Sequence, residues 1–172
     1  MNAYPDTSFL YALYRQQVNS PAAAALFQKL PEPLVVSSLL LFEFRQSVRL
    51  QGYLFAQDNR RGFSWKLGAT LLRTLQTDLA AGALVVASVD WADVQNIAER
   101  LSSQYTLAGG HRAVDILHVA TALHLGADEF LTFDDNQRTL AFLQPHEGNA
   151  VASHQALGLI HDMIQRLGQR LA

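Results

Sequence analysis

Cysteine is absent from this sequence of 172 residues. Its absence excludes disulfide bonds, thiolate zinc sites and cysteine nucleophiles, and it suits a reducing compartment. Long apolar runs are absent as well, since no stretch approaches the roughly 20 residues that a membrane-spanning helix needs. The first residues also lack the basic and apolar regions of a secretory signal. We therefore expect a soluble, cytoplasmic protein that makes no contact with a membrane.

Positive charge is scarce too. Lysine and arginine together number 13 against 15 acidic residues, which gives a net charge of −2, and only Lys29 and Lys66 are lysines. The chain therefore lacks the overall positive field that drives nonspecific binding to nucleic acids, and any such contact has to be local. Arginine suits bidentate contact with phosphate, although solvated helix faces are the commoner place for it.

The remaining composition is that of a folded domain, with 49% hydrophobic and 16% charged residues. That supports one core, and no linker or repeat divides the chain, so we expect a single domain over residues 1–172. Short apolar runs alternate with amphipathic segments, which predicts a parallel sheet covered by helices on both faces. The expected strands end at Asp6 or lie at about 34–37, 83–89 and 129–133. Two further helices are expected at about 59–81 and, amphipathic and C-terminal, at about 151–171.

Four acidic residues follow the predicted strands or lie in the helices after them: Asp6, Glu43, Asp115 and Asp134. In open α/β sheets the carboxyl ends of the strands meet at one crevice, which is where ligands bind, so we expect these carboxylates to gather. Gathered carboxylates repel one another unless a cation compensates them. Mg²⁺ or Mn²⁺ prefers oxygen ligands and keeps several waters for a phosphate-bearing substrate. The pattern therefore predicts metal-assisted phosphodiester chemistry.

Two of the four acids lie in apolar helices. Asp115 stands within RAVDILHVATAL and Glu43 within LLLFEFRQ. A carboxylate buried in such surroundings costs free energy unless it is paired or bound to a metal. Pairing of Asp115 with Arg112, three residues earlier, is the structural alternative, and Arg45 or Arg49 is the equivalent for Glu43. The sequence leaves these alternatives open.

Other polar residues have simpler explanations. Asp90 and Asp93 form a capping pattern at a helix start, where the helix dipole favours acids, so we interpret both as structural. Histidine metal sites are weakly indicated. His118 shares the Asp115 helix, and His154 and His161 share a terminal helix face, but a capped or surface histidine is the commoner explanation.

Four segments resemble those of a known family when they are taken in order: DTSFL, SSLLLFEFRQ, DILHVATALHLGAD and EFLTFDDNQ. Together they span residues 6–137, and they are similar to the PIN-domain ribonucleases, particularly the VapC-type toxins of prokaryotic toxin–antitoxin pairs. The resemblance implies a three-layer α/β/α fold with a central, mostly parallel sheet of about four to five strands.

The resemblance also implies a Mg²⁺- or Mn²⁺-dependent endoribonuclease whose catalytic acids match four positions: Asp6, Glu43, Asp115 and Asp134. The first, third and fourth of these acids would hold the metal, while Glu43 would help to bind it or orient the attacking water. Asp135 is a possible further ligand, and Thr7 or Ser8 matches the hydroxyl beside the first aspartate. The implied partners are RNA, a small antitoxin protein and a second copy of the chain.

The sequence departs from this family in places. Pro5 should keep the first strand short or place it at the margin of the sheet. The segment between Glu43 and Asp115 is longer than in compact members, and the helix expected at about 59–81 is the addition. The alternative hypothesis is a PIN-like protein-binding module with little or no catalysis.

Overall fold

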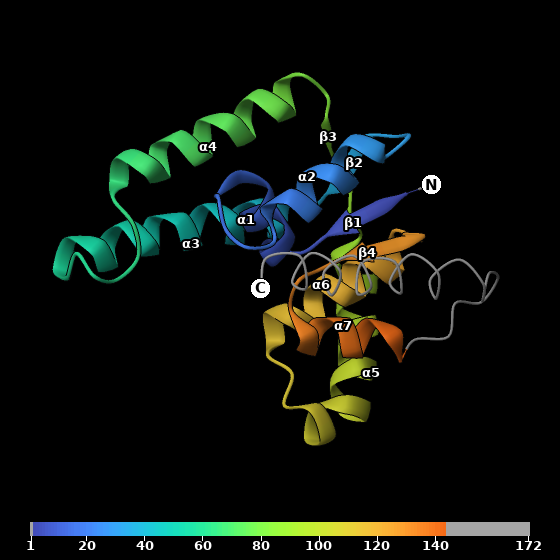
Figure 1. Cartoon of the computed structure of the whole chain (residues 1–172). Coiled ribbons are helices and arrows are strands. Elements are labelled where there is room, and N and C mark those ends of the chain that lie inside the picture. Colours follow the sequence, from blue (N-terminus) through green and yellow to red (C-terminus); the bar gives the residue numbers. More distant parts are fainter. Residues whose placement is uncertain (1, 144–172) are drawn as a thin grey trace, which may run out of the picture.

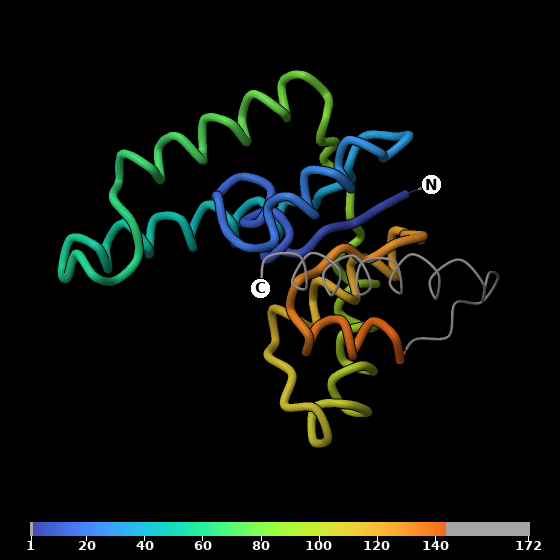
Figure 2. The backbone as a smooth tube through the Cα atoms, viewed as in Figure 1, coloured from blue at the N-terminus to red at the C-terminus, as the bar shows by residue number. Residues whose placement is uncertain are grey.

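A computed structural model describes residues 2–143 of the chain, shown as a ribbon in Figure 1 and as a tube in Figure 2. The helix expected at about 151–171 lies outside the described residues. The elements follow one another in this order: β1 (Ala3–Pro5), α1 (Thr7–Tyr14), α2 (Ser20–Lys29), β2 (Leu34–Val36), α3 (Ser38–Gln57), α4 (Trp65–Ala80), β3 (Leu84–Val86), α5 (Trp91–Gly109), α6 (Ala113–His124), β4 (Glu129–Leu131) and α7 (Asp135–Phe142).

The strands are short and parallel. β1 pairs with β4 and β2 pairs with β3, as two two-stranded ladders, and β1 lies next to β2 without a ladder of hydrogen bonds between them. Pro5 has no backbone N–H to donate, and the next donor along the chain, Asp6 N–H, bonds to Leu131 O at 2.9 Å. The first strand is short, as Pro5 predicted. The four strands of the described part of the chain agree with the expected number and parallel direction, although their hydrogen bonds form two pairs rather than one continuous sheet.

Helices cover the strands on two sides (Figure 1). A larger cluster of buried side chains joins β1 and β2 to helices α1, α3 and α4, with Tyr4, Phe9 and Phe44 at its centre. A smaller cluster joins α5, α6 and α7 through Val94, Val119 and Leu140. Phe130 of β4 packs against both clusters. This layering confirms the predicted α/β/α architecture.

Each strand leads directly to the start of a helix, and a polar side chain caps that helix. Asp6, Ser37 and Asp134 accept hydrogen bonds from N–H groups of the first turns of α1, α3 and α7. Asp90 does the same for α5, which confirms the capping interpretation of that residue. The capping chemistry therefore brings polar side chains to one end of the strands.

Helices α3 and α4 form an arm, here called the α3–α4 arm, that projects from the strands (Figure 1, Figure 2). The expected helix start at residue 59 is wrong, because α3 continues to Gln57 and Ser64 caps α4. Gly62 lies between them at φ 67°, and a Cβ there would lie 2.2 Å from Gln51 O. A helix cannot run through that turn. Among the described residues no helix has the length and apolarity to cross a membrane.

Candidate acidic site

Four elements deliver the four predicted acids. Asp6 follows β1 and caps α1, Glu43 lies in the second turn of α3, and Asp115 lies in the first turn of α6. Asp134 follows β4 and caps α7. Contacts through Thr132 and Arg112 link Asp6, Asp134 and Asp115. Glu43 belongs to a separate hydrogen-bonded group with Thr7 and His118.

Asp6 is fully buried, and its two carboxylate oxygens accept bonds from several neutral donors. Oδ1 accepts from the Ser8 hydroxyl at 2.7 Å and from Phe9 N–H at 2.8 Å. Oδ2 accepts from the Thr132 hydroxyl at 2.7 Å. Burial raises the pKa of Asp6 above its ordinary value, and these hydrogen bonds oppose the shift without cancelling it. Asp6 is thus held firmly but without a compensating charge from these donors.

Thr132 connects Asp6 to Asp134. Its hydroxyl donates to Asp6 and accepts from Asp134 N–H at 2.9 Å, and it lies 3.3 Å from the Ser8 hydroxyl. Ser8 in turn accepts from Phe133 N–H at 2.8 Å. Sequence reasoning gave Ser8 an auxiliary place and missed Thr132. A threonine two residues before Asp134, at the end of the predicted strand, is the signal that was available.

Glu43 is half-buried and hydrogen-bonds to two side chains from other elements. His118 Nε2 lies 2.5 Å from Glu43 Oε2, and the Thr7 hydroxyl donates to the same oxygen. Burial alone would raise the pKa of Glu43, but the hydrogen bonds from His118 and Thr7 outweigh it and hold that pKa below its usual value. Glu43 is therefore kept ionised and fixed in orientation. Arg45 and Arg49, the partners considered from the sequence, form neither a hydrogen bond nor an ion pair with Glu43, whose bonds go to Thr7 and His118.

His118 is a residue whose place the sequence interpretation missed. The expectation of a capped or surface histidine is wrong, since the ring is completely buried on α6. Its Nδ1 lies 3.4 Å from the Tyr4 hydroxyl, which bonds to the Ser37 hydroxyl at 2.7 Å. Because Nε2 faces the Glu43 carboxylate, we assign its hydrogen to that nitrogen. The spacing of three residues from Asp115 places both side chains on one helix face and could have indicated this role.

Asp115 is buried and bonded to Arg112, the structural alternative that the sequence had left open. The guanidinium donates from Nε to Asp115 Oδ2 at 2.8 Å and from Nη2 to Oδ1 at 3.3 Å. The same Nη2 lies 3.8 Å from Asp134 Oδ2. Gln137 of α7 donates to Asp115 Oδ1 at 3.1 Å. The hydrogen bond to Asp115 raises the pKa of Arg112, so one guanidinium serves two of the predicted metal ligands.

Asp135 stands apart from this network. Its side chain is 84% exposed and pairs with Arg138, one turn further along α7. Asp93 likewise lies outside the network and pairs with His124, 2.6 Å away. The structure therefore separates these two surface acids from Asp6, Glu43, Asp115 and Asp134.

The donor set fits a hard divalent cation in kind, since it consists of carboxylate and hydroxyl oxygens. Within residues 2–143, however, no three histidine, aspartate or glutamate side chains lie close enough together to form a metal-binding group. The positive charge at this place is the guanidinium of Arg112, whose electrostatic partners are Asp115, Asp134 and Glu43.

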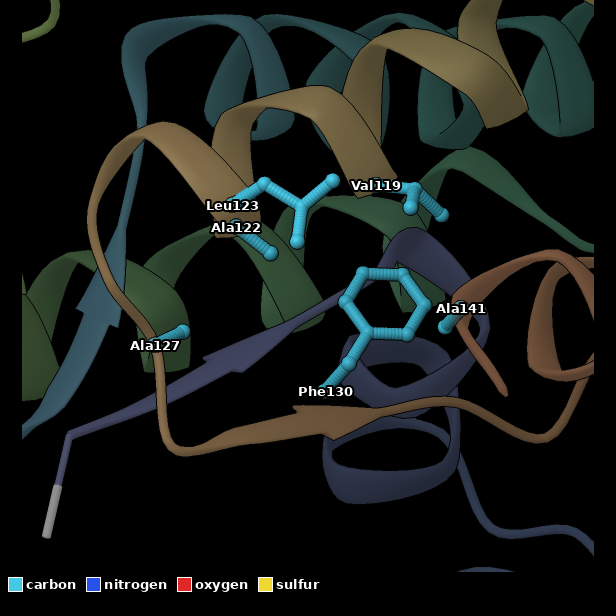
Figure 3. Close-up of a pocket in the computed structure, with 6 residues that line it drawn as sticks. All are labelled: Val119, Ala122, Leu123, Ala127, Phe130 and Ala141. Atoms are coloured by element: carbon cyan, nitrogen blue, oxygen red, sulfur yellow. The ribbon is translucent and has the colours of Figure 1, made fainter. Parts of the chain in front are cut away.

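A small pocket elsewhere has a different character (Figure 3). It lies between α6, β4 and α7, and only aliphatic and aromatic side chains line it: Val119, Ala122, Leu123, Ala127, Phe130 and Ala141. None of these side chains carries a group for acid–base or metal chemistry. The acidic side chains therefore remain the better candidate for a functional site.

Comparison with known proteins finds one matching family model and similar solved structures. The family model described as PIN domain matches residues 3–143. The solved structure of the Mycobacterium tuberculosis VapC20, a sarcin-ricin loop cleaving toxin, is similar with a TM-score of 0.58 and 18% identity, covering 80% of this chain and 94% of that chain. The solved structure of FitAcB from Neisseria gonorrhoeae is similar with a TM-score of 0.56 and 21% identity, covering 81% of this chain and 93% of that chain. At these identities the likeness concerns the fold. Among curated proteins, none matches this chain in sequence.

Proposed function

Because this chain belongs to the PIN-domain family, we propose that it is a Mg²⁺- or Mn²⁺-dependent endoribonuclease. The observation that carries the proposal is the burial of Asp6 at the end of β1, where its carboxylate accepts hydrogen bonds from neutral donors only and connects through Thr132 to the start of α7 at Asp134. An ionisable group that is buried without a compensating charge is a candidate functional group.

Asp6, Asp115 and Asp134 would hold the ion, and Glu43 would bind it or orient the attacking water. A bound Mg²⁺ or Mn²⁺ would lower the pKa of that water and stabilise the charge that develops on the phosphate. The chain itself supplies orientation. His118 and Thr7 both hydrogen-bond to Glu43 Oε2, which orients that carboxylate.

We extend the proposal to a toxin of a toxin–antitoxin pair, with a small antitoxin protein as partner and a homodimer as assembly. The likeness to the VapC20 toxin supports this, as does the apolar surface of the α3–α4 arm. Tyr53 and Trp65 on the arm are 61% and 55% exposed. Exposed aromatic side chains favour contact with a protein partner.

Cleavage of RNA by the Asp115→Asn variant tests the proposal. Asparagine keeps an acceptor for Gln137 but removes the charge, so we expect a loss of cleavage on the order of a hundredfold, as when one electrostatic contributor to a transition state is removed. The matched control is Asp93→Asn, which alters a surface acid outside the network and should cleave like the wild type. EDTA should abolish cleavage, and Mn²⁺ should restore it. Unchanged cleavage by Asp115→Asn would contradict the proposal.

A second candidate function is a protein-binding module with PIN-like architecture. It is favoured by the fact that Asp6, Glu43 and Asp115 each already have protein partners for their carboxylates. Calorimetry with Mn²⁺ separates the two functions. A nuclease binds the ion in a manner that Asp115→Asn weakens, whereas a module that keeps its acids for stability does not bind it there.

A further inference from the structure

The α3–α4 arm holds a larger share of positive charge than the rest of the chain. Residues 38–80 contain six basic residues and three acidic ones, whereas the whole sequence contains 13 and 15. The basic residues of the arm are Arg45, Arg49, Arg60, Arg61, Lys66 and Arg73. The arm therefore has a net charge of +3 in a chain whose net charge is −2. A local positive field of this kind attracts a polyanion.

Most of this charge has no carboxylate partner in the described part of the chain. The three acids of the arm, Glu43, Asp58 and Asp78, already bond to other side chains. Of the basic residues, Arg60 pairs with Asp58 at 3.3 Å. The other five form no ion pair with any side chain of residues 2–143. The described carboxylates therefore leave the positive field of the arm largely in place.

One face of α3 combines part of this charge with exposed aromatic side chains. Spacings of three or four residues bring side chains to one side of a helix. Such spacings join six side chains of α3, here called the α3 stripe: Phe42, Arg45, Gln46, Arg49, Tyr53 and Gln57. Phe42 and Tyr53 are 62% and 61% exposed. The stripe is free of acidic residues, since the single acid of α3, Glu43, lies beside it and bonds to His118 and Thr7.

The α3 stripe runs from the acidic side chains to the outer end of the arm (Figure 2). Phe42 directly precedes Glu43 near the start of α3, and Gln57 ends the helix before the turn to α4. A helix of 20 residues is about 30 Å long, which several nucleotides of an extended strand span. A linear polymer bound along the stripe is thereby led to the acidic side chains.

We propose that the α3 stripe binds single-stranded RNA, with the guanidinium groups of Arg45 and Arg49 on phosphates and the rings of Phe42 and Tyr53 stacked on bases. A guanidinium presents a planar pair of donors that suits phosphate oxygens. Exposed aromatic rings suit unpaired bases, whose faces a duplex hides. The choice of RNA as the polyanion rests on the proposed nuclease function, whereas the binding itself needs neither cleavage nor a metal ion.

A protein partner fits the stripe less well than RNA does. It would bury the two guanidinium groups of Arg45 and Arg49, and buried charge without an opposite charge costs free energy. RNA supplies a negative charge at every phosphate, and the Phe42 and Tyr53 rings lie along the helix among the cations rather than in one apolar patch. Alternation of cations and aromatic rings is the pattern that sequence-tolerant single-strand binding uses.

The first test is the affinity of the full-length protein for a short, fluorescently labelled single-stranded RNA, measured by anisotropy in EDTA. Loss of one stacking ring in Tyr53→Ala should weaken binding at least about fivefold. Tyr53→Phe keeps the ring and should bind like the wild type. For a duplex of the same RNA, whose bases are already stacked, Tyr53→Ala should match the wild type. Equal single-strand affinities of Tyr53→Ala and the wild type would overturn the proposal.

Size-exclusion chromatography of the same variants tests the competing occupant, a second copy of the chain. A Tyr53→Ala variant that changes its oligomeric state and keeps its affinity for RNA would make the stripe a protein interface, which overturns the proposal. An unchanged oligomeric state together with weakened binding of single-stranded RNA supports it.

The second test is the salt dependence of RNA binding by Arg49→Gln. Loss of one phosphate contact should make the slope of the log association constant against log salt concentration shallower by about 0.7, the value for one contact to a single strand. Arg100→Gln is the matched control, because Arg100 is an exposed arginine of α5 that forms no ion pair within residues 2–143. It should keep the wild-type slope. Equal slopes for the two variants would overturn the proposal.

Binding and cleavage together separate this inference from the proposed function. A wild type that binds RNA through the stripe but cleaves none with Mn²⁺ overturns the nuclease function and supports the stripe. A wild type that cleaves RNA, together with Tyr53→Ala and Arg49→Gln variants that bind it normally, overturns the stripe alone. A wild type that binds no single-stranded RNA overturns the stripe as well.

Discussion

The acidic site has two sides that satisfy carboxylates in different ways. On the hydroxyl side, formed by Asp6, Ser8 and Thr132, neutral donors bond to a fully buried carboxylate. On the guanidinium side, formed by Arg112, Asp115 and Asp134, a largely exposed cation binds two carboxylates. An aspartate is thus bonded to neutral donors within the fold on one side, and to the guanidinium of an exposed arginine on the other.

This difference separates stability from function. On the hydroxyl side the Asp6 carboxylate holds structural elements together. It caps α1, and it accepts a bond from Thr132, which also bonds to the start of α7. On the guanidinium side the compensating cation belongs to a mostly exposed side chain, so its contribution to stability is small.

Of the replacements on the two sides, Asp6→Ala is expected to lower the free energy of unfolding most. It leaves buried donors of Phe9, Ser8 and Thr132 without their acceptor, so the free energy of unfolding should fall by about 1 to 3 kcal/mol. Asp115→Ala should lower it less, because Arg112 is mostly exposed and Gln137 alone is left as a buried donor without its acceptor. Urea denaturation followed by circular dichroism measures both. Equal losses for the two variants would show that the two sides do not differ in this way.

Replacement of Glu43 by glutamine has an intermediate effect that depends on pH. The pKa of Glu43 is below its ordinary value of 4.5 in the folded chain, so its charge stabilises the fold above pH 4.5. This contribution is lost as the pH falls through the folded pKa. At neutral pH the wild type should therefore have a higher melting temperature than the Glu43→Gln variant. This difference in melting temperature should shrink below pH 4.5. A difference that grew on acidification would contradict the direction of the shift.

The sequence predicted the parts of the site that depend on local order. Asp6 and Asp134 follow strand ends and cap helices, and both features are visible within a few residues of each acid. The apolar surroundings of Asp115 correctly predicted its burial. The turn at Gly62 was missed because the sequence pattern did not show that a residue with positive φ separates α3 from α4.

The sequence could not show contacts that the tertiary fold creates. Glu43 and His118 are 75 residues apart, and Asp6 and Thr132 are 126 apart. Arg112 was visible as a partner for Asp115, since the two are three residues apart on one helix. Its approach to Asp134 depends on how α6 and α7 meet, which no local pattern specifies. The network therefore had to come from the structure.

The smallest effect is expected for Asp135, which the sequence allowed as a further metal ligand. Its side chain is 84% exposed and pairs with Arg138 on the same helix, so Asp135→Asn should change the free energy of unfolding by no more than about 0.5 kcal/mol. Mn²⁺ binding measured by calorimetry should also match that of the wild type, because the carboxylate faces away from the guanidinium side. Weakened Mn²⁺ binding in this variant would mean that the first turn of α7 reorients when the ion binds, and that the guanidinium side extends to a third carboxylate.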